Sequence, residues 1–160
     1  MAPGGAPGLP GRETAVEDLV RSGDLVREKV DGVKYIWPVD EQAEGDVSRV
    51  VRLLAPFDPV VWDRDRFEHL WGWPYRLEAY TPADKRRFGR YALSLLWTDR
   101  VIGWANLTCR KGQVEAELGF VDGRPDNPAF ERELEGELTR MAAFLQGRPE
   151  ELAPCLHASG

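Results

Sequence analysis

Four cationic side chains gather within six positions of the sequence: Lys85, Arg86, Arg87 and Arg90. Neighbouring cations on one turn cannot all be buried, and Lys and Arg side chains commonly contact the phosphates of nucleic acids. We therefore interpret this segment as the best candidate for contacting phosphates. A solvated basic patch without a ligand is the alternative. Arg64 and Arg66 are weaker candidates for the same role.

Asp58, Asp63 and Asp65 are close enough in sequence to act as paired carboxylates in acid–base chemistry. An independent enzyme that uses Asp58 and Asp63 is therefore one hypothesis. In the competing interpretation these residues are not catalytic: Asp58 fixes a turn, Asp63 caps a helix and Asp65 is solvated. The second interpretation is favoured, and no catalytic residue is assigned.

Other common site chemistries have little support. His69 and His157 are the only histidines, and Cys109 and Cys155 form neither a CxxC pair nor a cluster with histidine. The sequence also has no Gly-rich phosphate-binding motif. We expect no metal ion and no cofactor.

The charge distribution is uneven along the 160 residues, which carry a net charge of −6. Residues 47–91 hold nine Lys/Arg against six Asp/Glu, and the rest of the chain holds twelve against twenty-one. Nine of the sixteen aromatic residues also lie in residues 47–91. A basic, aromatic-rich stretch in an acidic protein is one way to form a binding face. From composition alone, the favoured interpretation is that the aromatics form a core and the arginines are solvated.

The first part of the chain predicts a helix followed by a β-hairpin. Residues 12–22 have apolar side chains at helical spacing, and Gly23 follows them as a C-terminal cap. Two short strands, 25–30 and 33–37, then flank the hairpin signal Asp31-Gly32. This order is that of the second half of a winged helix, so residues 12–40 are predicted to form its C-terminal part after a flexible tail, 1–11.

The second part predicts a sheet with flanking helices, so that the whole chain is α+β. It follows a polar linker at residues 38–46. No apolar run is long enough to span a membrane, and no secretory signal precedes the helix, so a cytoplasmic protein is expected. The expected elements are a strand or helix at 47–54, a helix at 64–71, a strand at 75–80, a helix at 81–88, strands at 91–98, 101–109 and 113–121, a helix from 127 to 146 and a tail at 148–160.

The segment Leu54 to Arg64 resembles a hallmark of the YcaQ-type crosslink-repair DNA glycosylases, also grouped as a winged-helix DNA-binding family. The family pattern there reads roughly L-x-P-F-D-x-x-x-W-D-R, and the continuation Y-R-x-E-x-Y-x-P is also matched. The resemblance covers about residues 9–146. The motif residues are Pro56, Phe57, Asp58, Trp62, Asp63, Arg64, Tyr75, Arg76, Glu78 and Tyr80.

The resemblance implies a partial winged helix followed by a small β-barrel-like domain over residues 47–147. It also implies a metal-free, nucleoid-associated protein that binds duplex DNA and excises alkylated or interstrand-crosslinked bases by hydrolysis of the N-glycosidic bond. The family's catalytic Gln-x-Gln or Gln-x-Asp lies in an N-terminal winged-helix region. The glutamines here, Gln42, Gln113 and Gln146, form no such motif.

We therefore expect the C-terminal half of such an enzyme, which binds DNA without catalytic competence of its own. Two alternatives stay open. The chain is a non-catalytic interaction module, or it is half of a split glycosylase whose partner polypeptide supplies the missing N-terminal winged-helix region.

Overall fold

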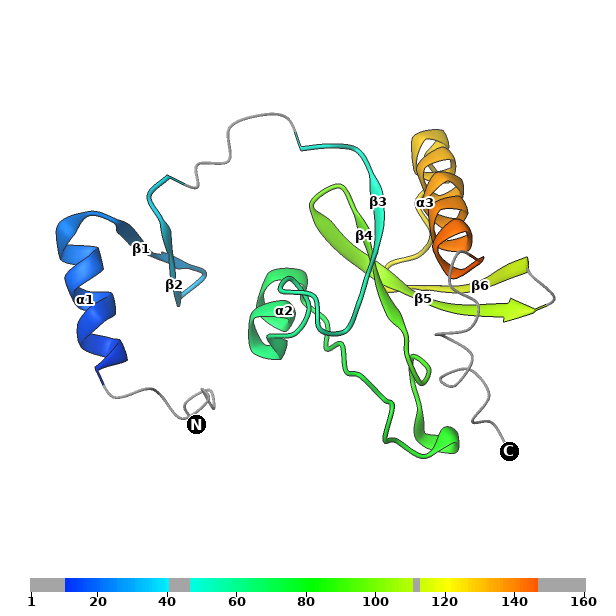
Figure 1. The fold of residues 1–160 in the computed structure, drawn as a ribbon, viewed down its shortest axis with the longest axis horizontal. Coiled ribbons are helices and arrows are strands. Elements are labelled where there is room, and N and C mark those ends of the chain that lie inside the picture. Colours follow the sequence, from blue (N-terminus) through cyan, green and yellow to red (C-terminus); the bar gives the residue numbers. More distant parts are fainter. Residues whose placement is uncertain (1–10, 41–46, 111–112, 147–160) are drawn as a thin grey trace. The chain divides into compact units, whose positions relative to one another are not determined.

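The computed structural model describes residues 11–40, 47–110 and 113–146 (Figure 1). The expected tail at 148–160, and nearly all of the one at 1–11, fall outside these ranges, as do residues 111 and 112 between two of the expected strands. The chain divides into two compact units, residues 1–46 and 47–160. Their elements are α1 (Arg12–Ser22), β1 (Leu25–Val30), β2 (Val33–Pro38), β3 (Val51–Leu54), α2 (Arg64–Trp71), the 3-10 turn η1 (Ala83–Lys85), β4 (Leu93–Trp97), β5 (Arg100–Arg110), β6 (Gln113–Phe120) and α3 (Pro128–Gln146).

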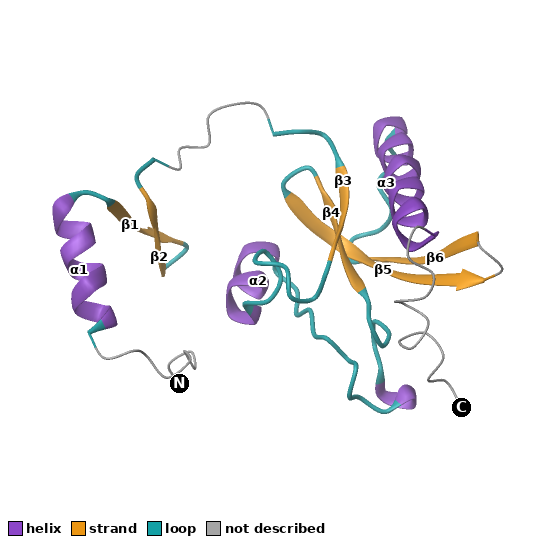
Figure 2. Cartoon of the chain, viewed as in Figure 1, coloured by secondary structure: helices purple, strands orange, loops and turns teal. Residues whose placement is uncertain are grey.

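The described part of the first unit, residues 11–40, is a helix followed by a hairpin, as the sequence predicts (Figure 2). Helix α1 ends at Gly23, whose φ of 87° lies in the left-handed region that suits glycine. Strands β1 and β2 pair antiparallel around Asp31 and Gly32, which both have positive φ. Two such residues in succession match the twist of a two-residue hairpin, which confirms the Asp-Gly signal.

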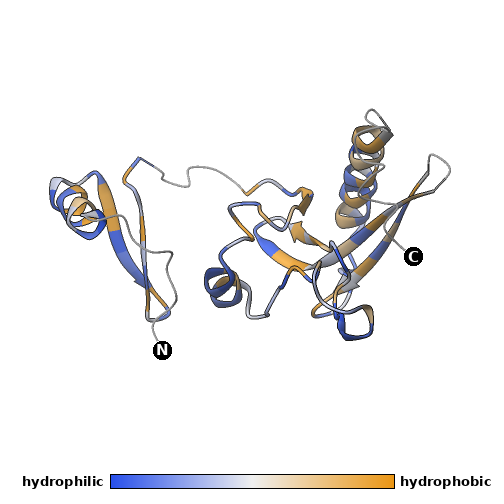
Figure 3. Ribbon diagram, turned by 60° about the horizontal axis from the view of Figure 1, so that its bottom comes forward, coloured by the Kyte–Doolittle hydropathy of each residue, from blue (hydrophilic) through white to orange (hydrophobic). Residues whose placement is uncertain are grey.

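No side chain of residues 11–40 is buried. Leu19, Val33 and Ile36 are each 43% exposed. The apolar start and the charged middle of β1 are visible in Figure 3. Helix and hairpin are linked by an ion pair at 2.6 Å between Arg27 and Glu17. This unit is therefore held by backbone pairing and surface contacts rather than by a core.

The second unit, residues 47–146 in its described part, contains a four-stranded antiparallel sheet in the order β3-β4-β5-β6. Strands β3 and β6 are its edges, so the described strands form an open sheet and not the barrel-like closure expected from the sequence. The expected strand or helix at 47–54 is the strand β3. The three later strands are found as a meander, with ends that differ from the prediction by one or two residues.

A β-bulge at Leu95 and Leu96 decides which residues of β5 face which side. Leu95 pairs with Gly103 while Leu96 pairs with Val101, which leaves Ile102 as the additional residue. Because of this additional residue, Val101 and Trp104 pack in the same apolar cluster although they are three positions apart.

The two faces of the sheet carry separate apolar clusters, one with α2 and one with α3. Successive residues of β4 alternate between them, since Leu95 belongs to the α3 cluster and Leu96 packs against the other. The buried residues of the α2 cluster are Val61, Phe67, Trp73, Tyr75, Phe88, Ala92 and Val101. Those of the α3 cluster are Val51, Leu95, Phe130 and Leu134.

A buried carboxylate ties α3 to the edge strand β3. Glu137 is 5% exposed and accepts a hydrogen bond of 2.9 Å from the backbone N–H of Leu53. Its other oxygen accepts two hydrogen bonds from Arg140, at 3.0 and 2.7 Å. The contact fixes the helix against the edge of the sheet. It also gives a partner to the N–H of Leu53 on the outer edge of β3, where no further strand pairs.

Two sequence predictions are wrong between β3 and β4. Residues 75–80 form no strand, and the helix predicted at 81–88 is only the short turn η1. Pro82 is the residue before the turn, and no side chain caps the turn there. The physical reason is long-range: the carboxylate of Glu78 accepts hydrogen bonds from the backbone of residues 87–89, which an α-helix would have used internally.

Candidate nucleic-acid interface

The candidate cations lie on one connection, residues 79–91, which we call the cationic loop. It leads from Glu78 to the start of the sheet meander. Phe88 is 5% exposed and inserts into the α2 cluster, where its ring centroid lies 5.0 Å from that of Trp104. Just beyond the loop, the hydroxyl of Tyr75 donates a hydrogen bond of 2.6 Å to the carbonyl of Ala92. The loop is therefore anchored at its middle and at its end.

Glu78 holds the loop from inside. Its side chain is 8% exposed, and the carboxylate accepts hydrogen bonds from three successive backbone N–H groups. The distances are 2.9 Å from Arg87 to each oxygen, 2.8 Å from Phe88 and 3.2 Å from Gly89. Hydrogen bonds to a charged acceptor are stronger than those between neutral groups, so this cage stabilises the loop conformation.

The cage also sets the pKa of two buried groups. Burial by itself would raise the pKa of Glu78, but the N–H groups of residues 87–89 and the nearby Arg86 guanidinium hold it below its ordinary value. Burial and the charge of Glu78 together raise the pKa of Tyr75 to about 12. Glu78 is therefore ionised and Tyr75 protonated at neutral pH, and neither is poised for proton transfer.

A second contact fixes the loop next to β5. The Nδ2 of Asn106 donates a hydrogen bond of 2.7 Å to the carbonyl of Phe88. Gly89 has a φ of 117°, and a side chain there would collide with the amide of Asn106. Gly89, which directly follows the helix expected at 81–88, instead allows this close approach.

The four candidate cations differ in their surroundings. Lys85 and Arg87 are exposed, and the Arg87 guanidinium lies 5.1 Å from the centre of the Phe88 ring. Arg90 is half-buried, with its guanidinium 5.4 Å from the centre of the Tyr91 ring. The Nε of Arg86 donates a hydrogen bond of 2.8 Å to the carbonyl of Thr81. Lys85 and Arg87 are thus the pair best placed to reach a ligand.

Tyr80 is the most exposed aromatic side chain at this loop, at 99%. It lies in the turn between the buried Glu78 and Thr81. The backbone N–H of Thr81 donates to the carbonyl of Glu78 at 3.0 Å. A wholly exposed tyrosine thus stands next to the cations on a backbone that is itself held in place.

The Pro-Phe-Asp motif forms a tight turn before α2. The carboxylate of Asp58 accepts from the N–H of Val60 at 2.9 Å, and that of Asp63 caps α2 by accepting from the N–H of Arg66 at 3.0 Å. These contacts match the structural interpretation of both residues. The hypothesis of an acid–base pair gains no support from them.

The other motif residues and the weaker candidate cations lie around the same turn. Arg66 donates to the carbonyl of Pro59 and is half-buried, whereas Arg64 is exposed. Phe57 and Trp62 are exposed, at 81% and 62%. Beyond α2, Arg76 donates to the carbonyl of Tyr75 and lies 3.4 Å from Glu68.

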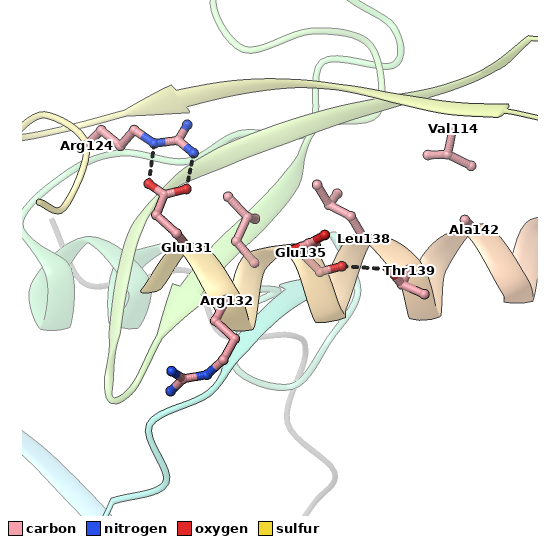
Figure 4. A pocket seen from close by; sticks show the side chains of 9 residues that line it. Val114, Arg124, Glu131, Arg132, Glu135, Leu138, Thr139 and Ala142 are labelled. Atoms are coloured by element: carbon pink, nitrogen blue, oxygen red, sulfur yellow. Dashed lines mark hydrogen bonds and ion pairs between the residues drawn. The ribbon is translucent and has the colours of Figure 1, made fainter. Parts of the chain in front are cut away.

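A cavity of about 610 Å³ lies on the other side of the sheet, between α3 and β6 (Figure 4). Arg124 and Glu131 form a paired ion contact at its rim, with distances of 2.8 and 2.6 Å. Arg132, Glu135 and Thr139 also line the cavity, beside four apolar side chains. The two cations, Arg124 and Arg132, are balanced by Glu131 and Glu135, so the cavity has no excess of positive charge comparable to that of the cationic loop.

Within the described residues, no group of three or more His, Cys, Asp or Glu side chains is arranged to hold a metal ion. None of the helices in this part of the chain is both long enough and apolar enough to cross a membrane.

Sequence reasoning identified the cations but missed what positions them. In the sequence, Glu78 and Tyr80 stand out only as motif residues, and nothing marks Asn106. A lone acid among aromatic residues, in Tyr75 to Tyr80, is the only sequence signal for the Glu78 cage. Nothing in the sequence pairs it with residues 87–89.

The sequence was compared with models of known protein families. A family model described as "DNA glycosylase AlkZ-like" matches residues 7–144, which is most of the chain. No solved structure matches the chain.

Proposed function

Since the chain belongs to the AlkZ-like DNA glycosylase family, we propose that residues 47–146 bind the phosphates of duplex DNA through the cationic loop. DNA glycosylases act in DNA repair, so DNA is the substrate that the family implies. The observation that carries the proposal is the Glu78 cage. In this cage the buried carboxylate of Glu78 accepts hydrogen bonds from backbone N–H groups, while Lys85 and Arg87 stay at the surface.

We further propose that residues 12–40 are the C-terminal part of a winged helix. The helix and hairpin order supports this assignment. The DNA partner would place the protein at the nucleoid in the cytoplasm. The lesion would be an alkylated or interstrand-crosslinked base, as the sequence resemblance implies.

The test is binding to a labelled duplex over a series of salt concentrations. Each phosphate contact releases counterions, so the affinity should fall steeply as salt rises. The variant Lys85→Glu/Arg87→Glu should bind more weakly and lower the salt slope by about 2, one for each contact. The matched control is Arg100→Glu/Arg132→Glu, which makes the same charge change at two exposed positions of the second unit outside the loop.

Equal losses in the two double variants would show that only net charge matters and would contradict a site at the loop. No binding by the unmodified chain at low salt would contradict the proposal as a whole. Circular dichroism of each variant establishes that the fold is intact.

We propose that these 160 residues do not excise a base by themselves. The sequence has no Gln-x-Gln or Gln-x-Asp, and the buried groups at the loop are not poised for proton transfer. Incubation with alkylated and crosslinked duplexes, followed by alkaline cleavage of abasic sites, should give no strand scission. Scission above the protein-free control would contradict this proposal.

A second candidate function is a non-catalytic interaction module or half of a split glycosylase. It is favoured by the first unit, in which Leu19, Val33 and Ile36 are exposed and no described side chain is buried. Surfaces of this kind are often covered by a partner. Binding of an apolar dye that Leu19→Ser/Ile36→Ser abolishes would support this candidate. A monomer that melts cooperatively without binding the dye would count against it.

A further inference from the structure

We propose that the ring of Tyr80 stacks on an unpaired nucleobase, so that the cationic loop prefers DNA in which a base has left the helical stack. This inference rests on the proposed DNA-binding function and names the form of DNA that the same site selects. The juxtaposition that carries it is a fully exposed tyrosine on a fixed turn beside a row of cations.

The first step is the exposure of Tyr80. At 99% it exceeds the exposure of the other exposed aromatics in the described residues, of which Phe57 is next at 81%. An aromatic ring has a large apolar surface, and removing that surface from water is favourable. The core of the described unit makes no use of the Tyr80 ring, so this favourable burial is available to a ligand.

The second step is the fixed position of the ring's backbone. On the N-terminal side of Tyr80, Glu78 is buried and accepts hydrogen bonds from three backbone N–H groups. On the other side, the carbonyl of Thr81 accepts a hydrogen bond from Arg86, one of the loop's own cations. A turn held at both ends loses little conformational freedom on binding, which favours affinity.

The third step is the charge around the ring. The loop carries four cations, and Asp84 is its only acid. A positive surface that follows the phosphates, together with an aromatic ring on which a base can stack, is the combination that binds single-stranded nucleic acid. An apolar pocket on another protein would also cover a tyrosine, but it would not explain the cations that accompany this one.

The last step concerns the accessibility of the base. In an intact duplex both faces of each base are stacked on their neighbours, so a protein ring cannot reach them. Enzymes that act on a base benefit when the base is unpaired or extruded, because unstacking then costs less. Stacking by Tyr80 would therefore favour damaged or distorted DNA over intact duplex.

The experiment compares two labelled duplexes, one intact and one with a single bulged 2-aminopurine, whose fluorescence is quenched by stacking. The full chain should bind the bulged duplex more tightly and quench its fluorescence. Tyr80→Ala should weaken binding to the bulged duplex about tenfold, remove the quenching and leave the affinity for the intact duplex unchanged. Tyr80→Phe keeps the ring and should behave as the unmodified chain.

The matched control is Phe144→Ala, which removes another exposed aromatic ring, on α3. It should change neither affinity nor quenching. Equal affinity of the unmodified chain for both duplexes would overturn this inference while leaving the proposed function standing. So would an equal loss of affinity for both duplexes in Tyr80→Ala. Failure to bind either duplex would contradict the proposed function itself.

Discussion

Residues 11–40 form a helix and a hairpin in which no side chain is buried, whereas residues 47–146 bury apolar clusters on both faces of one sheet. The first unit is specified by local signals, such as the left-handed Gly23 and the Asp31-Gly32 turn. The second depends on contacts between residues far apart in the chain. The difference teaches that secondary structure can be well specified without a core, but that a fixed surface loop requires one.

The largest loss in the free energy of unfolding is expected for Phe67→Ala, in the second unit. Phe67 is fully buried, and its ring centroid lies within 5.0 Å of those of Trp71 and Trp73. Removing the ring leaves a cavity, and the free energy of unfolding of the second unit should fall by about 3–5 kcal/mol. Denaturant unfolding followed by tryptophan fluorescence measures this. A loss below about 1 kcal/mol would mean that the cluster does not support the sheet.

A smaller loss is expected for Glu78→Gln, which replaces the charged acceptor of the loop. Hydrogen bonds to charged groups are worth more than neutral ones, so the free energy of unfolding should fall by about 2 kcal/mol at neutral pH. The exposed carboxylate of Glu131, paired with Arg124, provides the control, and Glu131→Gln should have a smaller effect.

The Glu78 variant also makes a prediction about pH. The pKa of Glu78 is lower in the folded protein than in the unfolded chain, so its contribution is present above the unfolded pKa. It should be lost as the pH falls through the folded value. The gap in unfolding free energy between the wild type and Glu78→Gln should therefore narrow in acid. A gap that stays constant down to low pH would contradict a charged cage.

In the first unit, we expect stability to depend on the conformation of the hairpin turn rather than on side-chain packing. Gly32 has a φ of 86°, and a side chain there would meet no neighbour. The cost of Gly32→Ala therefore comes from the backbone conformation alone, about 1–2 kcal/mol. Amide hydrogen exchange of β1 and β2 should quicken accordingly, while exchange in β4 and β5 is unchanged. Equal changes in both sheets would show that the two units unfold together.

The smallest effect is expected for Leu19→Ala. Leu19 is 43% exposed, and partly exposed positions of this kind change the free energy of unfolding by no more than about 0.5 kcal/mol. Denaturant unfolding followed by far-ultraviolet circular dichroism provides the measurement. A cost comparable to that of Phe67→Ala would show that another surface covers α1, and it would remove the contrast between the two units.

The sequence was a good guide where structure is set by neighbours. It predicted the turn at Asp31-Gly32, the Asp63 cap of α2 and the last helix, because caps and turns depend on residues a few positions apart. It failed over residues 75–88, where Glu78 captures the backbone nine to eleven positions ahead. It also predicted a barrel-like closure that the open sheet does not have.

The candidate site divides in the same way. The sequence alone shows the cluster of cations, because charged residues can be counted without knowing the fold; these are Lys85, Arg86, Arg87 and Arg90. The sequence does not show which of these cations reach the surface, since that depends on the contacts of Glu78 and Asn106. The exposure of Tyr80 could not be predicted for the same reason. The sequence predicts a strand over residues 75–80, and a strand residue can be either buried or exposed.

The buried Glu137 has a consequence for association between molecules. An edge strand with free N–H and C=O groups invites pairing with a strand of another chain. At β3 the N–H of Leu53 is already occupied by Glu137, so the helix α3 blocks a donor that an incoming strand would need. A chain in which α3 detaches would uncover that donor together with Phe130 and Leu134, and edge-to-edge aggregation would then begin at β3.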